Sequence, residues 1–278
     1  MRLRLSSAAF PHPPLPMEER RLPDRPVFED LSFEKHIRSE IVENTGSLRR
    51  YGIIAGVGYI LLFVLAIFAN FVVREGLIVA ADAAQTAVNI RGSEGLFRTG
   101  IVSFMLVFLI DVPVAWALYV LFSPVNRNLS LLSAWFRIVY TVFLGVALIF
   151  FFQALQLYSN AEFLRVFTEE QLNAQALTAL NLFNSTWLIG LLAFGVHLVI
   201  AGVLLIKSRW TVPLLGYIVM ISGITYVIDT AAHSLLANYA DYAMVLLVIV
   251  AVPSILAEGW FGLWLLIKGG KNIQAMPE

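Results

Sequence analysis

The apolar residues of this chain fall into six long runs, separated by shorter polar stretches. The runs cover residues 51–73, 99–122, 131–157, 183–206, 212–235 and 242–267. As a helix rising about 1.5 Å per residue, each run is long enough to cross a hydrocarbon layer of roughly 30 Å. An isolated span must satisfy its backbone internally, and the two-residue alternation of a membrane barrel is absent. The pattern predicts an all-α polytopic membrane protein, a bundle of six transmembrane helices.

The polar stretches define the predicted domain limits. Residues 1–48 form a predicted proline-rich, disordered cytoplasmic tail with a short surface helix, residues 49–270 the transmembrane domain, and residues 271–278 a second cytoplasmic tail. Six prolines between Pro11 and Pro26 forbid a helix there, and no apolar run follows the basic start, as a secretory signal requires. The same prolines could serve as a docking segment for a protein partner.

Two longer connections carry their own helix signals. The alanine-rich part of residues 75–98 predicts a short helix that ends between Gly92 and Gly95. Thr168 and Gln171 have the spacing of a capping box, so a helix is expected to begin there and to continue into the fourth run.

Lysine and arginine in the connections predict the orientation. One side receives seven of these cations and the other four, and the richer side is expected to be cytoplasmic. Both termini are then cytoplasmic, and a bacterial plasma membrane is the expected location. The richer side holds Arg49, Arg50, Arg127, Lys207, Arg209, Lys268 and Lys271, and the other Arg74, Arg91, Arg98 and Arg165.

Composition agrees with a membrane protein and excludes several functions. The chain is 59% hydrophobic and 14% charged, where soluble domains carry about 25% charged residues, so lipid is expected to cover much of its surface. The zero net charge gives no reason to expect nucleic acid. The absence of cysteine excludes disulfides, thiol catalysis and thiolate metal sites.

Several stretches together resemble a bacterial six-helix integral membrane family catalogued only as a domain of unknown function. The likeness covers roughly residues 49–270 and leaves the proline-rich tail outside. It implies a fold and a location but no chemistry. The stretches are TAVNIRGSEGLFRTGI, DVPVAWALYVLFSPVNRNLSLLSAWFR, PLLGYIVMISGITYVID and AEGWFGLWLLIKG.

Four ionisable residues lie inside the runs at nearly one depth. Measured from the predicted cytoplasmic ends, Asp111 lies about 16 Å deep, Arg137 about 10–12 Å, and His197 and Glu258 about 14 Å. Each shares a helix face with small or hydroxyl residues, which close helix packing in membranes favours. We therefore expect these four side chains to face the interior of the bundle.

Two interpretations of this inner set remain open. Arg137 could form a buried ion pair with Asp111 or Glu258, with His197 bonded beside it, and serve only to fix the helix register. Alternatively, the set is a ligand or proton site in a cavity open toward the cytoplasm. Arg137 is then the charge anchor, Asp111 and Glu258 the acids, and His197 the group that exchanges protons.

A second set lies nearer the predicted outer side. Asp229 and His233 are four residues apart on one helix face, and Arg98 is a plausible partner for Asp229. Asn70 and Asn184 lie at about the same height. The set is either a network that holds the outer loops or the outer mouth of a pathway.

The predicted function is to bind or transport a small molecule or proton through the buried polar cluster, without a cofactor or metal. Lipids and a small-molecule ligand are the expected partners. One alternative is a membrane-embedded, metal-dependent hydrolase centred on Asp229 and His233, which a depth difference of about 15 Å separates from His197. The other is a structural or regulatory membrane protein that uses its tail. Whether the chain is an enzyme is left open.

Overall fold

A computed structural model describes the backbone of residues 27–271 and the side chains of residues 47–271. The chain divides into two units, residues 1–41 and 42–278, and the account below concerns the second. The predicted disordered tail up to residue 26, its proline-rich docking segment and residues 272–278 lie outside the described residues.

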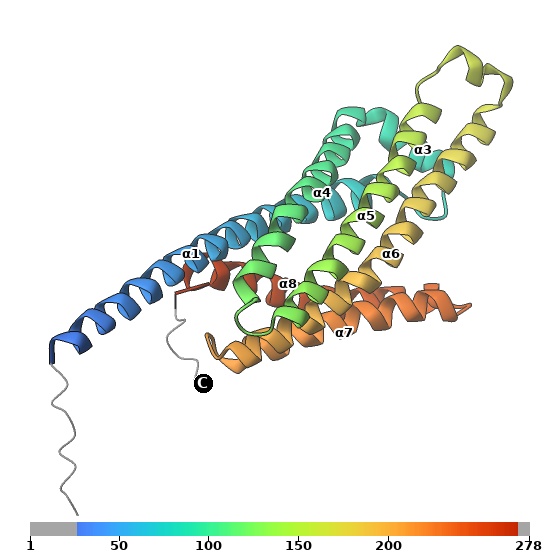
Figure 1. Cartoon of the computed structure of the whole chain (residues 1–278). Helices are drawn as coiled ribbons and strands as arrows, with labels where there is room; N and C mark the ends of the chain where they lie inside the picture. The colour runs from blue at the N-terminus through green and yellow to red at the C-terminus, as the bar shows by residue number, and fades with distance from the viewer. Residues whose placement is uncertain (1–26, 272–278) are drawn as a thin grey trace, which may run out of the picture. The chain divides into compact units, whose positions relative to one another are not determined.

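The described backbone is helical, and six helices are long and apolar enough to cross a membrane (Figure 1). The prediction of an all-α protein with six such helices is confirmed. The elements are α1 (Val27–Ile67), η1 (Phe68–Arg74), α2 (Glu75–Leu77), α3 (Ala83–Gly92), α4 (Glu94–Phe122), α5 (Arg127–Leu157), η2 (Glu162–Val166), α6 (Glu169–Ser208), α7 (Pro213–Leu235) and α8 (Tyr239–Ile267).

Helix starts follow the local signals in the sequence. Thr168 accepts from the backbone N–H of Gln171, whose side chain bonds back to Thr168, and the helix that begins there continues unbroken through the fourth apolar run. Asn126 caps α5 in the same manner, through the N–H of Leu129. The short alanine-rich helix α3 ends at Gly92, as expected. Most helices begin several residues before the apolar runs, because hydropathy marks the part suited to lipid and not the end of the hydrogen-bond ladder.

The first span departs from regular α-helix in a way that the sequence did not indicate. Residues Phe68–Arg74 form a π-helical segment, whose wider turn shifts the faces of the residues that follow. Its Val73 packs closely against Gly100 of α4. This segment positions Arg74, described below.

The six long helices contact one another in a closed ring. Consecutive helices from α4 to α8 pack against each other (Figure 1). Helix α1 closes the ring: Tyr51 stacks edge-on against Trp116 of α4, and Gly56 adjoins Leu266 of α8. In this order α4 lies opposite α7, and α5 lies opposite α8. We call the end with the α4–α5 and α6–α7 turns the basic end, and the other the acidic end.

Glycines allow two helix pairs to approach at backbone distance. A Cβ atom on Gly195 of α6 would lie 2.6 Å from the carbonyl oxygen of Gly223 of α7. Gly202 and Gly216 repeat this contact one heptad away along both helices. Small residues at such crossings are typical of membrane helices, because dispersion contacts replace the hydrophobic effect there.

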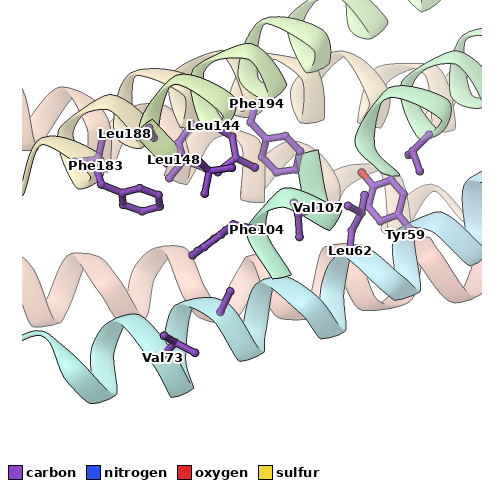
Figure 2. Packing of buried hydrophobic residues seen from close by; sticks show 14 of the residues in the cluster. Tyr59, Leu62, Val73, Phe104, Val107, Leu144, Leu148, Phe183, Leu188 and Phe194 are labelled. Carbon is purple, nitrogen blue, oxygen red and sulfur yellow. The ribbon is translucent and has the colours of Figure 1, made fainter. Parts of the chain in front are cut away.

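Aromatic side chains fill the core toward the acidic end. Phe151 of α5 and Phe183 of α6 stack with ring centroids 3.7 Å apart, and Phe97, Phe104 and Trp187 surround them. Figure 2 shows Phe104 and Phe183 turned toward each other within this packing. We call these five rings the aromatic layer. It occupies the bundle interior between the acidic end and the polar residues of the next section.

We expect Gly195→Ala to lower the unfolding free energy by about 1–3 kcal/mol, because the new methyl group meets backbone rather than a movable side chain. Thermal unfolding in detergent micelles measures the loss. Gly259→Ala in α8 is the matched control, since a Cβ there has no neighbour within 4 Å. Equal stability of the two variants would contradict the close α6–α7 approach.

Candidate functional site

Arg137 of α5 lies at the centre of the bundle with a side chain only 2% exposed. Its Nε donates to Oδ1 of Asp111 on α4 at 2.8 Å, and its Nη2 lies 2.5 Å from the same oxygen. The Asp111 side chain is 1% exposed. The sequence allowed Arg137 to pair with Asp111 or Glu258, and the structure forms the pair with Asp111.

The remaining side of the guanidinium is occupied by two further helices. Nη1 donates to the hydroxyl of Tyr59 on α1 at 2.8 Å and to Nε2 of His197 on α6 at 3.1 Å. The guanidinium carbon also lies 4.6 Å from the centroid of the Tyr59 ring and 5.4 Å from that of Phe194. Arg137 thus joins α1, α4, α5 and α6 through hydrogen bonds, an ion pair and cation–π contacts.

Thr141 completes the shell around Asp111. Its hydroxyl bonds to Oδ2 of Asp111, so both carboxylate oxygens are engaged. Thr141 follows Arg137 by four residues, which places both side chains on one face of α5. One helix therefore supplies two of the donors that hold the Asp111 carboxylate.

The partners of His197 define its tautomer. A guanidinium can only donate, so Nε2 must be the unprotonated nitrogen. Nδ1 then carries the proton and lies 3.0 Å from the carbonyl oxygen of Ser133 on α5. The hydroxyl of Ser133 in turn bonds to the carbonyl oxygen of His197 at 3.3 Å. His197 is therefore a neutral imidazole whose one lone pair is occupied by Arg137.

The cluster of Tyr59, Asp111, Arg137, Thr141 and His197 balances its own charge. One cation faces one anion, and the other members are neutral. Such a pair is tolerated in a low-dielectric interior only when its donors and acceptors are satisfied. Removing either partner leaves an uncompensated buried charge. We call these five residues the Arg137 cluster.

A small cavity adjoins the cluster on the side of the basic end. Its volume is about 10 Å³, close to the minimum for one water molecule. Ser130, Ser133 and His197 supply its polar lining, and Leu118, Phe122 and Leu204 are among its apolar walls. The cavity suits a water molecule and is too small for an organic solute.

Glu258 of α8 lies apart from the Arg137 cluster. Its Oε1 accepts a hydrogen bond from the hydroxyl of Tyr226 on α7 at 3.2 Å, and its side chain is half-buried. Next to it, Ser222 and Ser254 link α7 and α8 at 3.0 Å. The ring of Tyr226 meets Phe194, which also packs against His197. The structure thus brings Asp111, Arg137 and His197 into direct contact, whereas Glu258 forms no hydrogen bond or ion pair with them in residues 47–271.

The expected pairing of Arg98 with Asp229 is wrong. Arg98 forms its ion pair with Glu94 one turn earlier on α4, and both side chains are more than half exposed. Asp229 instead accepts from the hydroxyl of Tyr239 at 2.9 Å, and His233 packs edge-on against the same ring. Arg98 and Asp229 do not meet because α4 and α7 lie on opposite sides of the ring.

Arg74, and not Arg98, contacts the two asparagines of the second set. From the π-helical segment, its Nε donates to Asn70 at 2.7 Å and its Nη1 to Asn184 of α6 at 3.0 Å. Its guanidinium carbon lies 5.6 Å from the Trp187 ring centroid, and it forms an ion pair with Glu75. The sequence pattern places the two asparagines in the second polar set but assigns Arg74 to a connecting loop. A π turn leaves no periodic signal in the sequence, so it does not reveal that Arg74 still belongs to the helix.

A polar contact attaches the short helix α3 to α6. Arg91 forms an ion pair with Glu169 at 2.6 Å, and its guanidinium carbon lies 5.3 Å from the Tyr158 ring centroid. Burial raises the pKa of Tyr158, and the nearby Arg91 opposes this shift. These contacts hold the connection between α2 and α4 over the acidic end.

Metal ligation finds no support in residues 47–271, where no three histidine or carboxylate side chains gather closely enough to hold an ion. Asp229 and His233 adjoin Tyr239 and acquire no third ligand there. The hydrolase alternative therefore lacks a ligand set in the described part of the chain.

Comparisons with known proteins agree with this picture. The family described as "Domain of unknown function (DUF4386)" matches residues 54–269. An uncharacterised protein of Archaeoglobus fulgidus is 32% identical over 171 residues, which cover 62% of this chain and 84% of that protein. No solved structure matches the chain.

We expect Asp111→Ala and Arg137→Ala each to lower the unfolding free energy by about 3–5 kcal/mol, since each leaves one buried charge unpaired. The double variant should lose less than the sum. A double-mutant cycle in micelles measures the coupling. The exposed pair Glu94 and Arg98 is the control and should be nearly additive. Additive losses at Asp111 and Arg137 would show that the two do not act as partners.

Arg74→Gln should destabilise the protein by about 1–3 kcal/mol, because hydrogen bonds from a charged donor to Asn70 and Asn184 are lost. Arg98→Gln removes only an exposed pair and should cost less than about 1 kcal/mol. Thermal unfolding of the two variants side by side tests this. A larger loss at Arg98 than at Arg74 would contradict the stabilising role of the Arg74 hydrogen bonds.

Proposed function

The chain belongs to the family described as "Domain of unknown function (DUF4386)", and this membership supplies no activity. We propose that the protein binds a proton at the Arg137 cluster and rearranges its helices in response. One observation carries the proposal: Nη1 of Arg137 occupies the single lone pair of His197 at 3.1 Å, beside a cavity of water size. A proton fits such a site, whereas a small organic molecule does not.

The proton acceptor in this proposal is Nε2 of His197. A proton reaches it through a water in the cavity lined by Ser130, Ser133 and His197. Because Nδ1 already carries a proton, the second one makes the imidazole a cation. Its charged or titratable neighbours are Arg137 and, through Arg137, Asp111 and Tyr59.

Protonation forces Arg137 to leave His197. Two unit charges about 3 Å apart repel each other by about 5 kcal/mol at an effective dielectric constant of about 20. In addition, the donor Nη1 loses its acceptor. The withdrawal of Arg137 strains its bonds to Tyr59 and Asp111, and so acts on α1 and α4 as well as on α5 and α6.

Glu258 is the second acid in this scheme. It has only a tyrosine hydroxyl as hydrogen-bond partner within residues 47–271, so it is able to take either a proton or the displaced guanidinium. Phe194 lies between the two sites and contacts Arg137, His197 and Tyr226. Rotation of this ring is the step that would connect them.

The proposed location is the cytoplasmic membrane of a prokaryote, with the basic end inside. The seven cations at that end against four at the other support this orientation. The cavity then lies on the cytoplasmic side of the Arg137 cluster, and the aromatic layer lies on its outer side.

We expect the distance between labels on α1 and α5 to change when the pH falls from about 8 to about 4, a window that extends below the ordinary histidine range because burial and the Arg137 guanidinium both oppose a second proton on His197. The chain has no cysteine, so Ser47→Cys and Asn128→Cys, both exposed, accept spin labels selectively. Pulsed electron resonance on protein in lipid nanodiscs measures the distance. His197→Gln should abolish the change, because the acceptor is gone.

His233→Gln is the matched control, a second histidine in a span but outside the cluster, and it should keep the response. A wild-type protein without any change between the two pH values contradicts the proposal. So does a change that survives His197→Gln, which would assign the response to another group.

A further inference from the structure

The two ends of the bundle differ sharply in charge. Within residues 47–271 the basic end carries seven lysines and arginines and no aspartate or glutamate, whereas the acidic end carries four arginines and eight acids. The acids are Glu75, Asp82, Glu94, Glu162, Glu169, Glu170, Asp229 and Asp241. Apart from Arg137 with Asp111, every ion pair in these residues lies at the acidic end.

One of the seven cations, Arg49, forms hydrogen bonds within the bundle. Arg49 donates to the carbonyl oxygens of Leu265, Leu266 and Gly269, at and just beyond the end of α8. The other six residues are exposed: Arg50, Arg127, Lys207, Arg209, Lys268 and Lys271.

Two of the exposed cations lie on turns that are fixed against each other. Phe122, the last residue of α4, stacks on Trp210 of the α6–α7 turn with ring planes 16° apart. This contact holds the α4–α5 turn, which leads to Arg127, beside the end of α6 and the turn after it, which carry Lys207 and Arg209. Trp210 itself is buried, so the stack is a rigid base under the three charges.

Arg209 ends α6 at its C-cap, with a φ of 57° in the left-handed region, where glycine or asparagine is the usual residue. Its side chain is exposed next to the buried Trp210.

We propose that the α4–α5 and α6–α7 turns form a binding site for the headgroup of an anionic phospholipid, with Arg127, Lys207 and Arg209 as its ligands. The charge of the partner follows from the three cations and the lack of an acid at this end within residues 47–271. Its lipid nature follows from the position of the turns, at the ends of helices that cross the hydrocarbon layer. Arginine pairs with phosphate through two parallel hydrogen bonds, which suits a phosphodiester. This inference does not rest on the proposed function.

Native mass spectrometry of the full chain in non-ionic detergent tests the site. We expect the wild type to retain added phosphatidylglycerol in preference to phosphatidylcholine. Arg127→Gln with Arg209→Gln should reduce this preference roughly 25-fold, about fivefold for each cation removed. The matched control is Arg98→Gln with Arg165→Gln, two exposed arginines of the acidic end, which should leave the preference unchanged.

Three results would overturn the proposal. The first is equal retention of the two lipids by the wild type. The second is a preference that survives in the Arg127 and Arg209 double variant, with its fold verified by circular dichroism. The third is complete displacement of phosphatidylglycerol by millimolar inorganic phosphate, because the site would then bind the free anion and not a lipid.

Discussion

The burial of one guanidinium group determines how the helices of this bundle are arranged. A guanidinium in a membrane interior needs a counter-charge and hydrogen-bond acceptors. The partners of Arg137 come from three other helices. Asp111 supplies the counter-charge, Tyr59 and His197 supply acceptors, and two aromatic faces cover the group. Because these partners are far apart in sequence, the requirement fixes the register of α1, α4, α5 and α6 at once. Dispersion packing alone specifies register much less strongly.

Close apolar packing and polar contacts lie at different levels along the bundle axis. Glycine contacts between α6 and α7 bring the backbones together where no charge is present. The aromatic layer fills the interior on the acidic side of the Arg137 cluster. On the basic side a small cavity reaches Ser133 and His197. The cluster thus adjoins packed aromatic rings on one side and a small cavity on the other.

Much of this arrangement could be predicted from residue spacing, and the failures have one physical origin. Hydropathy gave the six helices, and depth along each helix with its small-residue face placed Asp111, Arg137 and His197 at a common level. Depth says nothing about the order of helices around the ring. Arg98 and Asp229 have similar heights, but α4 and α7 lie on opposite sides, so they do not meet. For the same reason Glu258 of α8 does not touch Arg137 of α5. Tyr59 and Arg74 were missed because a tyrosine in an apolar run and a π turn carry no distinctive pattern.

The stacked pair of Phe151 and Phe183 has a consequence for the movement of water and protons along the bundle axis. These two rings come from adjacent helices and touch at 3.7 Å, so any continuous file of water across the bundle must first part them. The rings have no polar atom that could relay a proton in their place. In this conformation the stack therefore blocks the axial route in both directions and leaves the Arg137 cluster next to the small cavity on its basic side.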